Sequence, residues 1–289
     1  MLPTESETHL RAAAGAMREG DPKRATKHVD AVLAAIPDHP GANRLRGAIH
    51  LHLGESALAV PYLRAAVAAG LDAPGVGVVT LAELGVALAQ SGDAAGGIDA
   101  LRDALKFSPG NTQIALALGQ ALLDNGEAAE AEPLLRRAVA AKPIVERAWL
   151  VLGRLLFEAH RDEEARETFT AITQRDPNHI PAIYNLALLD QRAGRYAEAA
   201  ARFARCRGTL GPARALMLGW AQCLLELGQI DAALGLFREL LKVDRDAYAA
   251  ALRTLTTASK GCFHNRGGEL RAMLGLSDES GPDSTATSH

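Results

Sequence analysis

The sequence has few of the residues that mark disulfide-rich or aromatic-rich proteins. Three cysteines among 289 residues are too few for the disulfide framework of a small secreted domain. Aromatic residues make up only 4% of the chain, which argues against a stacking platform for carbohydrate or single-stranded nucleic acid. The 34 acidic and 31 basic residues nearly cancel to a net charge of −3. The whole-chain charge therefore gives no support to a general polyanion-binding role.

Long apolar runs are also missing. The most apolar stretch, residues 73–89, is interrupted by Pro74, several glycines and Glu83, and it is shorter than the roughly 20 residues that a membrane-spanning helix needs. Residues 1–9 lack the basic start and apolar run of a secretory signal. We therefore expect no membrane association and a cytoplasmic location.

The sequence contains no recognisable catalytic or metal-binding motif. A phosphate-binding glycine loop, a serine nucleophile elbow and a His-Glu-x-x-His helix are all missing. Cys262 and His264 form the one close Cys/His pair, without the second pair that zinc needs. Cys206 and Cys223 fall at positions of an internal repeat that are apolar elsewhere, so we interpret them as packed thiols. We predict no enzymatic activity, cofactor or metal.

What the sequence does have is a regular spacing of small and bulky residues. Turn-forming glycines are spaced by 34, 38, 34, 68 and 34 residues, with His160 at the midpoint of the doubled interval, at Gly20, Gly54, Gly92, Gly126, Gly194 and Gly228. A small residue follows each by five positions, and a bulky one comes four later, as with Ala131 and Leu135. Seven units fit this spacing, at residues 6–39, 40–73, 78–111, 112–145, 146–179, 180–213 and 214–247. The chain is therefore a repeat protein.

Each unit has the pattern of two amphipathic helices. In the fourth, apolar residues recur every three or four positions over 114–124 and 128–141, on either side of Gly126. This glycine is expected to take the left-handed conformation that ends the first helix. Acidic residues such as Asp21, Asp93 and Glu127 follow the turns and are candidate caps. Small residues on the first helices, such as Gly85 and Gly119, are expected to face the small position of the second helices and let the two pack closely.

This pattern resembles the tetratricopeptide repeat family, with the fifth unit matching well at Trp149, Leu152, Gly153, Ala165, Phe169 and Pro177. The resemblance implies an all-α, right-handed superhelical solenoid of about seven helix–turn–helix units. The first two units depart from it at His9 and Asn43. We expect units in 6–73 and 78–247, separated by an insertion at Pro74–Gly77 that would act as a kink or hinge. Residues 248–276 would supply a capping helix and a short helix, and 277–289 a disordered tail.

In this family the first helices line the concave face and bind peptides. Carried over by position, the resemblance implies a groove formed by Arg44, Val86, Leu116, Gln120, Arg147, Leu150, Arg154, Phe157, Tyr184, Leu188 and Gln222. The groove is mostly aliphatic, and Arg147 and Arg154, two helical turns apart, would hold a carboxylate of the partner. Alternatively, the same apolar residues fill the inside of a tight superhelix.

Two functions fit this surface. The first is a non-enzymatic scaffold or adaptor that binds a partner protein or peptide through apolar anchors and an acidic residue. The second is a regulatory or substrate-presenting subunit of a separate protein-modifying enzyme. Six arginines between Arg192 and Arg214, with Glu198 as the single carboxylate in that stretch, would form either a solvated outer face or a site for a phosphate-rich or acidic partner. Nucleic acid is not favoured, and neither the partner nor the oligomeric state is predicted.

Overall fold

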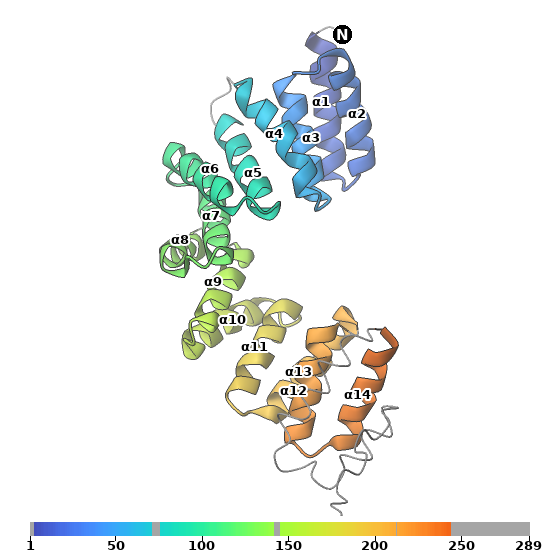
Figure 1. Cartoon of the computed structure of the whole chain (residues 1–289), viewed down its shortest axis with the longest axis vertical. Coiled ribbons are helices and arrows are strands. Elements are labelled where there is room, and N and C mark those ends of the chain that lie inside the picture. The colour runs from blue at the N-terminus through green and yellow to red at the C-terminus, as the bar shows by residue number, and fades with distance from the viewer. Residues whose placement is uncertain (1–2, 71–75, 142–144, 212, 244–289) are drawn as a thin grey trace, which may run out of the picture. The chain divides into compact units, whose positions relative to one another are not determined.

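The computed structural model describes residues 3–70, 76–141, 145–211 and 213–243, and every regular element in them is an α-helix (Figure 1). The first eight helices are α1 (Pro3–Arg18), α2 (Pro22–Ala35), α3 (Pro40–His52), α4 (Ser56–Ala68), α5 (Val76–Gln90), α6 (Ala94–Phe107), α7 (Thr112–Asp124) and α8 (Ala128–Ala140). The others are α9 (Glu146–Glu158), α10 (Asp162–Arg175), α11 (Ile180–Arg192), α12 (Tyr196–Leu210), α13 (Arg214–Glu226) and α14 (Ile230–Val243). The fold is an α-solenoid of helix–turn–helix repeats, as the sequence predicts.

The chain folds as two compact units, Met1–Leu155 and Leu156–His289. In the first unit α1 to α8 pack in succession, and α1, α3, α5 and α7 also contact one another in sequence. In the second unit α10 to α14 pack in succession, and α11 contacts α13. The first helices of neighbouring repeats therefore form a layer within each unit, as expected of stacked repeats.

The expected insertion at Pro74–Gly77 is only partly described. Val76 and Gly77 already belong to α5, and α4 packs against α5. Residues 71–75 lie outside the described residues, as do Cys262 and the expected segments 248–276 and 277–289. The sequence did not predict the division between Leu155 and Leu156.

The turn within each repeat closes in the same way. All six turn glycines have positive φ angles, and His160 takes a φ of 56° at the equivalent position. After α7, the N–H of Glu127 donates to the carbonyl of Leu122 at 2.8 Å, and the N–H of Gly126 donates to the carbonyl of Leu123 at 3.0 Å. These two bonds form the Schellman motif, which satisfies carbonyls at the helix end. The left-handed turn predicted at Gly126 is confirmed.

Side-chain caps begin several helices. Asp21 accepts a hydrogen bond from the N–H of Arg24 at 2.9 Å, and Asp93 accepts one from the N–H of Gly96 at 3.0 Å, so both predicted caps are confirmed. Glu127 occupies the same position before α8 but makes no side-chain cap bond. The longer glutamate side chain is a poorer match for this geometry than aspartate.

The two helices of a repeat pack through a glycine that receives a bulky side chain. A Cβ atom added to Gly119 would lie 2.8 Å from Leu135 Cδ2, and one added to Gly85 would lie 2.7 Å from Leu101 Cγ. The sequence prediction named the small residue of the second helix as the opposing group. The structure shows the small residue near the glycine, with the carbonyl oxygen of Ala131 3.5 Å from the Cβ added to Gly119. The bulky residue comes closer still, because a helical leucine leans back over the preceding turn. Gly97 also approaches Gly85, with its carbonyl oxygen 2.9 Å from the added Cβ.

Candidate peptide-binding site

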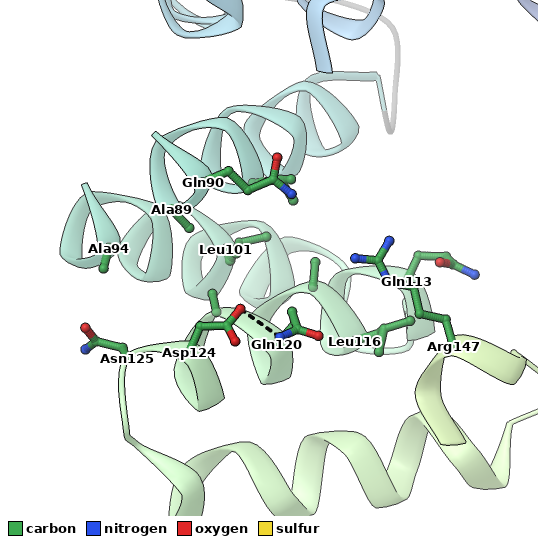
Figure 2. Close-up of a pocket in the computed structure, with 13 residues that line it drawn as sticks. Ala89, Gln90, Ala94, Leu101, Gln113, Leu116, Gln120, Asp124, Asn125 and Arg147 are labelled. Atoms are coloured by element: carbon green, nitrogen blue, oxygen red, sulfur yellow. Dashed lines mark hydrogen bonds between the residues drawn. The ribbon is translucent and has the colours of Figure 1, made fainter. Parts of the chain in front are cut away.

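Helices α5, α6 and α7 and the start of α9, all within the first unit, surround a pocket of about 280 Å³ (Figure 2). It is lined by Val86, Ala89, Gln90, Ala94, Leu101, Gln113, Leu116, Ala117, Gln120, Ala121, Asp124, Asn125 and Arg147. Four residues of the predicted groove, Val86, Leu116, Gln120 and Arg147, are therefore brought together. They come from first helices of three successive repeats, since α5, α7 and α9 each begin a repeat.

The pocket combines aliphatic walls with amides and one carboxylate. Val86, Ala89 and Ala117 supply partly exposed apolar surface above the buried Leu101 and Leu116. Figure 2 shows Gln90 on the helix opposite Leu116 and Gln120. The Gln120 amide donates to the Asp124 carboxylate at 2.7 Å, and Gln90 accepts a hydrogen bond from the Ser56 hydroxyl at 2.7 Å. Amide groups that are held in place in this way can orient a polar backbone beside an apolar anchor.

Arg147 is the cation of this pocket. Its side chain is exposed and extends beside Gln113 (Figure 2). Within residues 3–70, 76–141, 145–211 and 213–243, the Arg147 guanidinium has no hydrogen-bond or ion-pair partner. It therefore carries an uncompensated positive charge at the edge of an apolar pocket.

The other two predicted cations are engaged by carboxylates of the chain itself. Arg44 makes a two-pronged contact with Glu83, with both N···O distances at 3.0 Å. Burial raises the pKa of the Glu83 carboxyl, and Arg44 partly offsets this effect. Arg154 donates to Asp124 at 2.6 Å. The prediction that Arg147 and Arg154 share the same role therefore does not match the pairing that the structure shows.

The remaining predicted residues lie elsewhere. Leu150 is half-buried on α9. In the second unit Phe157 lies under the Arg192 guanidinium, 3.5 Å from its ring centre. Tyr184 and Leu188 pack against the core, with Tyr184 edge-on to Phe203. Burial raises the pKa of the Tyr184 hydroxyl.

Gln222, the last predicted residue, accepts a hydrogen bond from the Gln191 amide at 2.9 Å. This bond joins α13 to α11, the first helices of neighbouring repeats. Whether any of the predicted groove residues contacts a partner stays a prediction.

Gln90 and Asp124 belong to the pocket but were missing from the predicted groove. They stand at the same place in their repeats, 34 residues apart. A signal for them was present, because Asp124 lies four residues after Gln120, on the same helical face.

Two sequence profiles, both described as tetratricopeptide repeat, match the chain. One matches residues 10–74 and 116–180, and the other matches residues 88–143 and 191–255. Together they cover most of the chain, in the register of the turns described above. The chain belongs to the tetratricopeptide repeat family.

Solved structures of other tetratricopeptide repeat arrays share this fold. PilF of Pseudomonas aeruginosa superimposes with a TM-score of 0.55 at 15% identity, covering 86% of this chain and 96% of its own. PilW, a widely conserved type IV pilus biogenesis factor, superimposes with a TM-score of 0.53 at 18% identity, and the match covers 86% of this chain and 98% of PilW. MamA superimposes with a TM-score of 0.50 at 21% identity, and the match covers 57% of this chain and 90% of MamA. Among curated proteins, none matches this sequence. At these identities the similarity shows the fold alone.

Several of the six arginines between Arg192 and Arg214 form ion pairs with carboxylates of the chain itself. Arg192 donates to Asp162 at 2.6 Å, Arg195 donates to Asp190 at 3.0 Å, and Arg207 pairs with Glu239. The sequence window contained Glu198 as its one carboxylate. The actual partners lie on α10, α11 and α14, up to 32 residues away. Whether the stretch is a solvated outer face or a site for an acidic partner stays a prediction.

The two described cysteines are packed thiols, as predicted. Cys206 and Cys223 are fully buried. Burial raises the pKa of Cys206, and it raises the pKa of Cys223 to about 12. Within the described residues no group of three or more His, Cys, Asp or Glu side chains is arranged to hold a metal ion. No helix in the same ranges has the length and apolar character to cross a membrane.

Proposed function

We propose that this chain is a non-enzymatic interaction scaffold that binds an extended segment of a partner protein in the pocket between α5, α7 and α9. The segment would carry an aliphatic side chain next to an acidic one. The observation that carries the proposal is the Arg147 guanidinium, without a carboxylate partner among the described residues, at the pocket whose partly exposed apolar residues include Val86 and Ala117.

The pocket is large enough for a peptide side chain. Small-molecule sites typically enclose about 300–1,000 Å³, and this pocket, at about 280 Å³, falls just below that range. A leucine- or valine-sized anchor would lie against Val86, Ala89 and Ala117. Its burial would contribute about 1.5–3 kcal/mol.

One anchor is not enough for stable binding. A charge-assisted hydrogen bond to Arg147 would add about 1.5–3 kcal/mol. Association itself costs about 4–15 kcal/mol in lost translational and rotational freedom. The segment therefore needs further contacts, which the layer of first helices α1, α3, α5 and α7 offers on the same unit.

The test is selection of binding sequences from a random peptide library displayed on phage. The purified chain is the bait, and an Arg147→Glu variant and an Arg64→Glu variant are screened beside it. Arg64 is an exposed arginine on α4 that does not line the pocket. Arg64→Glu therefore makes the same change in charge as Arg147→Glu without altering the pocket lining. The proposal predicts enrichment of peptides with an acidic residue next to an aliphatic one, and loss of their binding only in Arg147→Glu.

Two outcomes contradict the proposal. One is that the enriched peptides bind both variants equally well, which would place their site away from Arg147. The other is that no peptide family is enriched although both variants and the natural chain melt at the same temperature.

A further inference from the structure

A buried carboxylate in the second unit stands where most repeats have an apolar residue. Asp190, on α11, is 1% exposed. The residues at the equivalent repeat position are Ala16, His50, Leu88, Leu122, Leu156 and Leu224. Four of these six are leucines, which shows that this position can be filled by apolar packing alone. The aspartate therefore calls for a separate explanation.

Asp190 gathers three arginines from three parts of the fold. Its Oδ1 accepts hydrogen bonds from Arg166 of α10 at 2.8 Å and from Arg195, at the start of α12, at 3.0 Å. Its Oδ2 accepts one from Arg202 of α12. Because α10 belongs to the preceding repeat, the carboxylate holds together guanidinium groups from two repeats. We call Arg166, Arg195 and Arg202 the arginine cluster.

The arginine cluster has more positive charge than Asp190 neutralises. Asp190 is the one carboxylate that is hydrogen-bonded to the three guanidinium groups, and Glu163 and Asp162 of α10 also act on Arg166. Burial and Arg195 lower the pKa of Arg166, although Glu163 and Asp162 partly offset this, and burial, Arg166 and Arg205 lower the pKa of Arg202. A single arginine would be enough for a structural ion pair, so the two extra cations point to a further anion.

The arginine cluster is also accessible. The exposed fraction of the side chain is 23% for Arg166, 42% for Arg195 and 33% for Arg202. Each donates to Asp190 and, among the residues that the structure describes, has no other hydrogen-bond acceptor. A guanidinium has five N–H donors, so the exposed parts of these side chains have donors to offer to a ligand.

We propose that the arginine cluster binds a phosphorylated side chain of a partner protein. A phosphoryl group carries about −1.5 to −2 charges at neutral pH and three acceptor oxygens, which suits three guanidinium groups that share a single bonded carboxylate. Guanidinium groups bind phosphate oxygens through paired hydrogen bonds. The site lies in the second unit and does not depend on the pocket around Arg147.

The test uses a library of peptides with a fixed phosphoserine between random residues. The tightest binder is then compared by calorimetry with its serine twin, its glutamate twin and inorganic phosphate. We expect the phosphopeptide to bind about tenfold or more tightly than each of these three. Arg195→Gln and Arg166→Gln should each lower its affinity about tenfold. Arg238→Gln, a control at an exposed arginine of α14, should leave it unchanged.

The result can go against the proposal in three ways. Equal affinity for the phosphoserine and glutamate peptides would make the cluster a site for acidic residues. Equal affinity for inorganic phosphate would make it a site for the free ion. Unchanged phosphopeptide affinity in Arg195→Gln, the variant of the most exposed member and the least apt to disturb folding, would place binding elsewhere.

Discussion

Gly119 and Leu135 are packed so closely that the glycine has no room for a side chain. A Cβ atom at Gly119 would lie 2.8 Å from Leu135 Cδ2 and 2.9 Å from Leu135 Cγ. Leu135 is fully buried, so it has no free space into which to move. This contact fixes how near α7 and α8 approach each other, and the same arrangement recurs between Gly85 and Leu101.

Replacing Gly119 with alanine should therefore destabilise the array. Overpacking against Leu135 costs about 1–3 kcal/mol, which outweighs the gain in helix propensity of about 0.5–1 kcal/mol. Gly15→Ala is the matched control, because a Cβ at this helical glycine of α1 meets nothing within 4 Å. Urea unfolding should show Gly119→Ala less stable and Gly15→Ala equally or more stable than the natural chain. Equal stability of the two variants would refute the packing account.

The turn at His160 offers a stabilising substitution. His160 has a φ of 56°, where the other six repeat turns have glycine. The left-handed conformation strains a residue that has a side chain by about 1–2 kcal/mol, and glycine removes this strain. Glycine also makes the unfolded chain more flexible, which lowers the free energy of unfolding by about 0.4–1 kcal/mol. His160→Gly should raise the free energy of unfolding by about 0.5–1 kcal/mol. The reverse change, Gly126→Ala, should lower it, and a loss of stability in His160→Gly would contradict this reasoning.

The buried thiols should resist modification over a wide pH range. Burial raises the pKa of Cys223 to about 12, and the thiolate is the reactive form. A Cys262→Ser variant, which keeps only Cys206 and Cys223, should react very slowly with Ellman's reagent in its folded state, with little increase between neutral pH and pH about 9. Because the unfolded thiol titrates at its ordinary value, the protein should also lose stability as the pH rises from about 9 towards 12. Rapid labelling of the folded variant at neutral pH would contradict the burial of both thiols.

Local features of this fold could be predicted from the sequence, and longer-range ones could not. The turn at Gly126 and the cap at Asp93 depend on residues a few positions apart, so their chemistry is visible in the sequence. The groove positions Val86, Leu116 and Arg147 follow from the repeat register, since equivalent residues of stacked repeats lie side by side.

The ion pairs depend instead on which side chains meet between repeats. Glu83 lies 39 residues from Arg44, and Asp190 lies 24 residues from Arg166. Nothing in the spacing distinguishes an arginine with such a partner from one without, so Arg44, Arg154 and Arg147 looked equivalent. Only the packing of side chains, between α3 and α5 for Arg44 and between α7 and α9 for Arg154, separates these two from Arg147.

The central claim is that Arg147 binds an acidic residue of a partner segment. The most direct test is a charge-swap cycle, in which the affinity of a selected peptide is measured with Arg147→Glu, with its acidic residue changed to lysine, and with both changes together. The account predicts that each single change weakens binding about tenfold or more and that the double change restores much of the loss, because opposite charges meet again. Additive losses with no recovery would show that Arg147 does not contact that residue and would contradict the account.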